Sequence, residues 1–184
     1  MAKVLVIRLS AIGDVAMTVP VIYSAAKANP EDSFTVLTQA FLMPLFMNRP
    51  PNVEVIGINT KGAEKGLIGL LKFISALLKF DFDVILDLHN VIRTIIICTF
   101  FRLNGKRVFV LDKARKERKR LTAIKGKRLY PLRPVIVRYA DVFRAAGLNY
   151  TETFTSLYEE FPAELSGMAS VAGIKKGKWI TPVQ

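Results

Sequence analysis

The segment from residue 3 to residue 28 constrains the fold most, because a short apolar run passes directly into a helical pattern. Residues 4–7 are apolar and mostly β-branched, which is typical of a strand buried on both faces of a sheet. A chain that leaves a parallel strand through a short turn into a helix forms a ligand site at the carboxyl end of that strand. The sequence therefore predicts such a site, with the carboxylate of Asp14 in the first turn of the helix.

The glycine pattern of this turn argues against two common phosphate-binding loops. Of the three glycines that form the dinucleotide-binding fingerprint, this turn has only Gly13. The Gly-Lys-Ser/Thr sequence of a P-loop does not follow it either. The second apolar run ends in Thr38 and Gln39, where dinucleotide-binding domains place an acidic ribose ligand. A nicotinamide-dependent oxidoreductase is therefore a weaker hypothesis than a site built around a carboxylate.

Strand and helix patterns alternate along the chain to about residue 146. We expect strands over 3–8, 33–38, 53–58, 83–87 and 106–111. We expect helices over 14–28, 40–46, from the glycines at 62–69 to about residue 80, 91–103, 114–121 and 134–146. This order predicts an α/β fold with a doubly wound parallel sheet. Strands buried on both faces also explain the high mean hydropathy of +0.31.

Composition excludes several classes of protein. The single cysteine, Cys98, lies in an apolar helical run and is expected in the core, so no disulfide or cysteine metal site is predicted and a reducing cytoplasm fits. His89 is the only histidine, so no metal site is expected there either. The apolar run before Arg8 is too short for a signal peptide, and no apolar stretch is long enough to span a bilayer.

The net charge of +12 comes from one segment. Residues 102–138 hold 14 of the 27 Lys and Arg residues but only 2 of the 15 Asp and Glu residues. Such an asymmetry points to an anionic partner contacted by one face of the molecule. A nucleic acid is one candidate, although no aromatic-interleaved motif of a known nucleic-acid module appears in the segment. A solvated helix without a partner is the other alternative.

Three motifs resemble those of the ADP-heptose:lipopolysaccharide heptosyltransferases, glycosyltransferase family 9. Arg8-Leu-Ser-Ala-Ile-Gly-Asp14-Val-Ala-Met-Thr-Val-Pro20 is similar to the family's amino-terminal Arg-x-Ser-x-x-Gly-Asp followed by a helix with a proline. Asp87-Leu-His-Asn-Val-Ile-Arg93 resembles the family's Asp-x-x-x-x-x-Arg motif at the end of the fourth strand. Leu111-Asp-Lys-Ala-Arg115-Lys-Glu-Arg118 is similar to the basic segment after the fifth strand. The resemblance covers nearly all of residues 1–160.

The resemblance implies a GT-B fold, in which two Rossmann-like domains face each other across a cleft. Residues 1–160 would be the amino-terminal, acceptor-binding domain. Residues 161–184 would be an interdomain linker and the start of a truncated donor-binding domain, because the family's Gly-Pro-Asp/Glu-x-Gly donor motif is absent. An ordinary frayed terminus is the alternative. No cofactor is expected, ADP-heptose would be a substrate of the complete enzyme, and this chain would be inactive alone.

The implied activity is inverting transfer of a sugar to a lipopolysaccharide core acceptor, with Asp14 as the catalytic base. The first turn of a helix stabilises an ionised carboxylate, which can take the proton of the acceptor hydroxyl. Helix N-capping is the alternative role for this residue. Ser10, Gly13, His89, Asn90 and Arg93 would bind the acceptor, with Gly13 allowing close approach to the backbone. A satisfied structural histidine and an exposed helix charge are the alternatives for His89 and Arg93.

The basic segment supplies the remaining predicted contacts. Lys113, Arg115 and Arg118 are expected to bind the phosphates and carboxylates of the anionic glycolipid. Another face of the same helix would rest on an anionic membrane, which would place a cytoplasmic protein at the inner face of the inner membrane. The competing hypothesis is a basic, nucleic-acid-binding α/β module, and RNA binding with a steep salt dependence would favour it.

Overall fold

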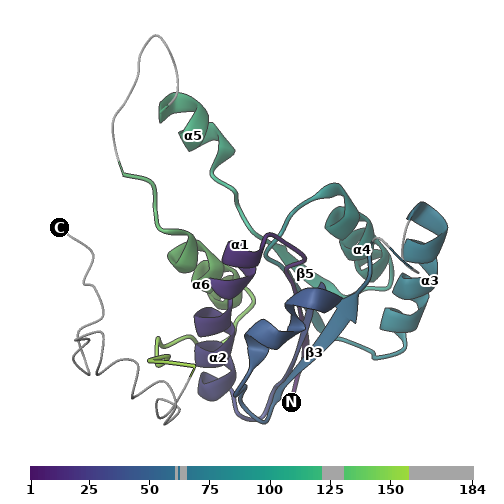
Figure 1. Ribbon diagram of the computed structural model, residues 1–184, viewed down its shortest axis with the longest axis horizontal. Helices are drawn as coiled ribbons and strands as arrows, with labels where there is room; N and C mark the ends of the chain where they lie inside the picture. The colour runs from purple at the N-terminus through teal and green to yellow at the C-terminus, as the bar shows by residue number, and fades with distance from the viewer. Residues whose placement is uncertain (61, 63–65, 122–130, 158–184) are drawn as a thin grey trace, which may run out of the picture. The chain divides into compact units, whose positions relative to one another are not determined.

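The computed structural model of the chain describes residues 1–157 except 61, 63–65 and 122–130 (Figure 1). Met1–Phe154 form one compact unit. The segment 161–184, for which a linker and the start of a second domain are predicted, lies outside the described residues. Within the described part of the chain, no helix is long and apolar enough to cross a membrane.

Five parallel strands form one sheet, and the order of the strands reverses next to the first. The spatial order is β3 (Val53–Ile58), β2 (Ser33–Gln39), β1 (Lys3–Ile7), β4 (Val84–Asp87) and β5 (Arg107–Val110). The chain moves outward from β1 to β3 and then returns to pair β4 with the other side of β1. Ligands of open α/β sheets bind at such a switch point, outside the carboxyl ends of the strands.

Helices cover both faces of this sheet (Figure 1). On one face lie α1 (Ile12–Ala16), α2 (Val19–Ala28) and α6 (Val135–Ala145), and on the other lie α3 (Gly66–Leu78) and α4 (Ile92–Leu103). Alternate strand residues supply the two cores, because successive side chains of a strand point to opposite faces. Leu5 and Ile7 pack with α3 and α4, whereas Phe34 stacks on Phe143 of α6. The predicted doubly wound parallel α/β sheet is confirmed.

Most predicted elements differ from the observed ones only at their ends, but the helix expected over 14–28 is two helices. The chain breaks between α1 and α2, where the Thr18 hydroxyl donates to the carbonyl of Val15 at 2.6 Å. Pro20 lies in the first turn of α2, where its missing N–H costs nothing. The segment Ala40–Phe46 is a 3₁₀ helix, η1, and α5 (Arg115–Leu121) begins after Lys113.

Candidate active-site cavity

Asp14 is the third residue of α1 and is paired with a buried cation. The N-cap position of α1 is Ala11, so the predicted alternative of N-capping by Asp14 does not apply. The Asp14 carboxylate forms an ion pair with the guanidinium of Arg8, the residue that follows β1. Arg8 is 6% exposed, whereas the Asp14 side chain is 42% exposed. A fixed cation therefore orients a carboxylate that solvent or a ligand can reach.

Arg8 joins the elements around this carboxylate. Its Nη1 donates to the carbonyl of Leu88 at 2.6 Å, beyond the end of β4. Its guanidinium carbon lies 5.8 Å from the ring centroid of Tyr139 on α6, a cation–π distance. Its buried Nε has no hydrogen-bond partner within the described residues. The segment from Arg8 to Pro20 thus supplies both the Asp14 carboxylate and the guanidinium that orients it.

Asp87, at the end of β4, fixes the loop that carries the predicted histidine. Its carboxylate is fully buried, and Oδ1 accepts from the backbone N–H groups of His89 and Asn90, both at 2.8 Å. Asn90 has a φ of 51°, in the left-handed region that asparagine tolerates, and its side chain donates to the carbonyl of Leu111 at 3.0 Å. This turn directs His89 toward β1, where its Nε2 lies 3.4 Å from the Ser10 hydroxyl.

His89 is neutral at physiological pH. Burial, together with the positive charge of Arg8, lowers the pKa of its imidazole to about 4. Its Nδ1 is buried and has no hydrogen-bond partner in the described part of the chain. No group of three or more His, Cys, Asp or Glu residues that could hold a metal ion occurs among the described residues. The ring is therefore available to exchange a hydrogen bond with a ligand.

These groups line a cavity of about 300 Å³ at the switch point of the sheet. From the predicted site it contains Ser10, Asp14, His89 and Lys113. Sequence reasoning missed the remaining lining residues: Arg8, Ala11, Leu111, Val135, Arg138 and Tyr139. Tyr139 is fully buried, its hydroxyl has no partner within the described residues, and burial raises its pKa. No local pattern on α6 marks Tyr139, because only the tertiary fold brings α6 to the carboxyl end of β1.

A neighbouring cavity of about 560 Å³ contains more of the predicted residues. Asn90, Lys113 and Arg115 line it together with residues 112, 114, 116 and 117, and Lys113 borders both cavities. Gly13 is exposed and lines neither cavity, and a Cβ there would meet open space. Arg93 is half-buried on α4 and also lines neither cavity. The Arg118 side chain lies outside the described part of the structure.

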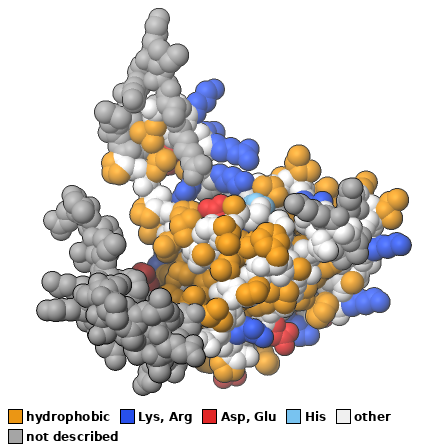
Figure 2. All heavy atoms as spheres, viewed as in Figure 1, with side chains coloured by type: hydrophobic (Ala, Val, Ile, Leu, Met, Phe, Trp, Pro, Cys, Tyr) orange, Lys and Arg blue, Asp and Glu red, His pale blue; other side chains and the backbone are white. Residues whose placement is uncertain are grey.

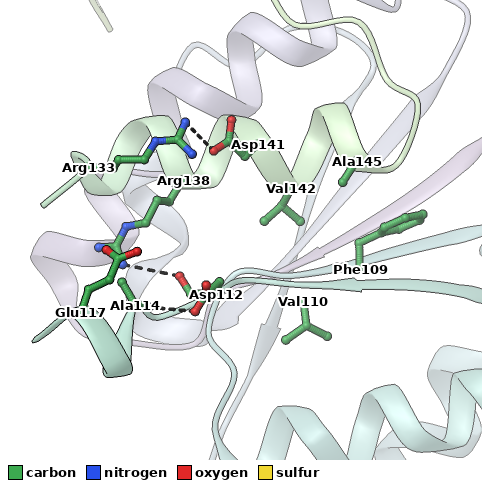
Figure 3. Close-up of a pocket in the computed structure, with 10 residues that line it drawn as sticks. All are labelled: Phe109, Val110, Asp112, Ala114, Glu117, Arg133, Arg138, Asp141, Val142 and Ala145. Atoms are coloured by element: carbon green, nitrogen blue, oxygen red, sulfur yellow. Dashed lines mark hydrogen bonds and ion pairs between the residues drawn. The ribbon is translucent and has the colours of Figure 1, made fainter. Parts of the chain in front are cut away.

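A third cavity, of about 250 Å³, lies between β5, α5 and α6 (Figure 3). Two of its arginines have partners: Arg133 forms an ion pair with Asp141 at 2.8 Å, and Arg138 Nη1 donates to the carbonyl of Asp112 at 3.4 Å. Arg138 also lines the cavity at the switch point, together with Arg8 and Lys113, and Asp14 is the one carboxylate among the lining residues of that cavity. Its excess of positive charge suits an anionic ligand.

Comparison with solved structures finds the same fold in bacterial glycosyltransferases. No family model matches the sequence, and no match is found among curated proteins. The glycosyl transferase family 9 protein of Veillonella parvula matches 95% of this chain with a TM-score of 0.61 and 20% identity. E. coli heptosyltransferase WaaC, solved with ADP-2-deoxy-2-fluoro heptose, matches 84% with a TM-score of 0.56 and 21% identity. E. coli ADP-heptose lps heptosyltransferase II matches 94% with a TM-score of 0.55 and 20% identity.

The chain spans about half the length of these solved structures, covering 51%, 50% and 51% of them respectively. At this level of identity the likeness establishes the fold. The comparison therefore confirms the fold that the resemblance to glycosyltransferase family 9 implies. The chain has the Rossmann-like fold of one half of a GT-B glycosyltransferase.

Proposed function

We propose that this chain is the acceptor-binding half of a heptosyltransferase-like enzyme. In this proposal it binds an anionic glycolipid of the lipopolysaccharide core, and a nucleotide-sugar donor such as ADP-heptose supplies the sugar. The observation that carries the proposal is the Asp14 carboxylate, held by Arg8 in a cavity at the switch point. The likeness to glycosyltransferases supports it.

Asp14 acts as the general base in this proposal. Transfer with inversion requires removal of the proton from the acceptor hydroxyl as the new bond to the anomeric carbon forms and the donor diphosphate leaves. Proton transfer comes late, when the new bond to the anomeric carbon has made the hydroxyl more acidic. Arg8 fixes the direction of the carboxylate, which reduces the cost of aligning base and hydroxyl.

The polar and charged side chains that line the cavity bind the acceptor. The neutral His89 ring and the Tyr139 hydroxyl hydrogen-bond sugar hydroxyls, because each has a buried polar atom without a partner in the described residues. Lys113 and Arg138 pair with a carboxylate or phosphate next to the reacting hydroxyl. Arg115, in the neighbouring cavity, reaches further charges of the same glycolipid. No cofactor is proposed, and the protein acts in the cytoplasm at the inner face of the inner membrane.

The first test is binding of a soluble acceptor by the chain of 184 residues. Calorimetric titration with a deacylated Kdo-containing glycolipid should give saturable binding. Lys113→Gln should weaken that binding by about 10-fold, as expected for a charge-assisted contact. Arg133→Gln is the matched control, because Arg133 pairs with Asp141 in the third cavity.

The same titration with single-stranded RNA distinguishes the competing hypothesis. RNA binding that exceeds glycolipid binding and falls steeply with salt would favour a nucleic-acid-binding module. Absence of glycolipid binding, or equal losses in Lys113→Gln and Arg133→Gln, would contradict the proposed acceptor site.

A further inference from the structure

The two helices on the far side of the sheet from α6 expose apolar side chains to solvent. α4 buries Thr94, Ile97, Cys98 and Phe101 against the sheet, but Ile92, Ile95 and Leu103 are exposed on its opposite side. Ile92 and Leu103 are 79% and 78% exposed. Leu67 and Ile68 are also exposed at the start of α3. We call these five residues, Leu67, Ile68, Ile92, Ile95 and Leu103, the outer apolar face.

The exposed apolar residues of α4 lie on one side of that helix, which they share with the exposed Thr99. Positions 92, 95 and 103 follow the i, i+3, i+11 pattern of one side of a helix, so they form a stripe of about 16 Å along its length. α3 packs beside α4 over the same face of the sheet, and both contribute to one core. α4 thus exposes three large apolar side chains on the side that the sheet does not cover.

The charged residues on α3 and α4 themselves have one sign, whereas Asp81, just after α3, is paired with Lys106. Neither α3 nor α4 contains an acidic residue, whereas Lys72 and Arg102 are exposed on them. Figure 2 shows hydrophobic and basic side chains together over the region where Figure 1 places these helices. An apolar stripe flanked by cations is the pattern of a helix that lies in the interface of an anionic bilayer.

We propose that the outer apolar face inserts into the headgroup region of an anionic lipid membrane, with α4 parallel to the membrane plane. Association with a second copy is disfavoured, because each copy has a net charge of +12 and neither α3 nor α4 contains an acidic residue. The exposed residues are all Leu or Ile, whereas protein interfaces are anchored mainly by Trp, Tyr and Arg. This contact is distinct from the α5 contact expected from the charge pattern.

The experiment measures cosedimentation of the chain with vesicles of equimolar phosphatidylglycerol and phosphatidylcholine. The wild-type chain should bind these vesicles and should bind pure phosphatidylcholine vesicles more weakly. The triple variant Ile92→Ser, Ile95→Ser, Leu103→Ser should lower the partition coefficient by at least about 10-fold, because it removes most of the inserted apolar area. The matched control is Phe41→Ser with Met47→Ser, which removes exposed apolar residues in and just after η1.

A second readout does not depend on the fold of the triple variant. Cys98 is buried and its thiol pKa is raised to about 12, so a thiol-reactive dye would label an introduced surface cysteine selectively. A polarity-sensitive dye at Ile95→Cys should shift to the blue on anionic vesicles. The same dye at Phe41→Cys should not shift.

The proposal fails if the wild-type chain does not bind anionic vesicles, or if the triple variant binds like the wild type. It also fails if the variant Arg115→Gln, Lys116→Gln, Lys119→Gln loses binding while the variant at residues 92, 95 and 103 does not. The membrane contact would then lie on α5. A wild-type dimer that the triple variant dissociates would identify the face as an interface between copies instead. The vesicles contain no acceptor sugar, so these outcomes do not depend on the proposed transferase activity.

Discussion

The two ends of the same parallel sheet treat their polar groups differently. At the amino end, the Asp32 and Asp83 carboxylates accept backbone N–H groups of residues 2 and 3 at 2.6 and 2.8 Å, and Asn52 donates to three carbonyls. At or near the carboxyl end lie all five buried side-chain N and O atoms that lack a partner in the described residues: Arg8 Nε, Thr38 Oγ1, His89 Nδ1, Arg138 Nε and Tyr139 Oη. The polar groups of these residues at the amino end are thus satisfied within the fold, whereas several at the carboxyl end have no partner in the described residues, as a ligand-binding site would require.

This contrast predicts that substitutions at the two ends change different measurements. Under the proposed function, the largest effect is expected for Asp14→Asn in a two-domain version of the protein. Loss of the base should reduce transfer from ADP-heptose by about 10²–10⁴-fold. The melting temperature should also fall, because the buried guanidinium of Arg8 loses its carboxylate partner, so transfer is compared at a temperature at which both proteins are folded. Activity is measured by release of ADP.

Asp141→Asn is the matched control for that variant, because Asp141 is also paired with an arginine but lies in the third cavity. It should retain near-wild-type turnover. Comparable turnover in Asp14→Asn would remove Asp14 from the mechanism.

At the amino end, Asn52→Ala should destabilise the fold by about 1–2 kcal/mol, because it removes an amide donor shared by three carbonyl groups, of which those of Ala26 and Asn29 keep a backbone donor. Urea unfolding measures this loss. Affinity for the acceptor should not change, since residue 52 is at the opposite end of the strands from the cavity. A weakened affinity without a loss of stability would reverse the assignment of the two ends.

The neutral state of His89 predicts a dependence of stability on pH. The imidazole titrates at about 4 in the folded state and near 6.5 when unfolded, so only the unfolded state gains a proton between these values. Stability should be complete above about pH 6.5 and should fall by ~1–2 kcal/mol toward pH 4, after discounting for the partial exposure of the ring. Because the chain has one histidine, proton NMR assigns the titration unambiguously. A midpoint near 6.5 would show that the ring is solvated.

The smallest effects come from removing single hydroxyl groups. Tyr139→Phe should leave stability unchanged, because its buried hydroxyl has no partner in the described residues, and should weaken acceptor binding by about 5-fold. Tyr23→Phe is the matched control, because the Tyr23 hydroxyl donates to the carbonyl of Met47 at 2.9 Å. It should cost about 1 kcal/mol of stability without changing affinity. The opposite pattern would mean that Tyr139 serves the fold.

The sheet could be predicted from the sequence because its strands are short apolar runs bounded by polar turns. Val53–Ile58 agrees with the prediction at both ends, and the other strands agree to within one residue at each end. The break between α1 and α2 was missed although Pro20 marks it, because the apolar periodicity continues through both helices. Local patterns therefore predict whether a segment is helix or strand better than they predict where one helix ends and the next begins.

The residues that line the cavity could be predicted only where they lie in a recognisable motif just after a strand. Ser10, Asp14 and His89 follow neighbouring strands, so the rule for the carboxyl ends of parallel strands brings them together. Arg138 and Tyr139 come from a helix far along the chain, and their place depends on how α6 packs beside α2. The contacts of Arg8 could not be predicted either, because its partners come from three separate parts of the chain that only the tertiary fold brings together.

The most direct test of the cavity as an acceptor site is titration of the isotope-labelled chain with the deacylated Kdo-containing glycolipid, followed by amide chemical shifts. We expect the largest shifts at Ala11, Asp14, His89, Lys113 and Tyr139, with none at residues 32, 52 and 83 of the amino end. Shifts centred on the amino end or on α6 beyond the cavity, with the loop after β1 unchanged, would contradict the assignment of this cavity to the acceptor.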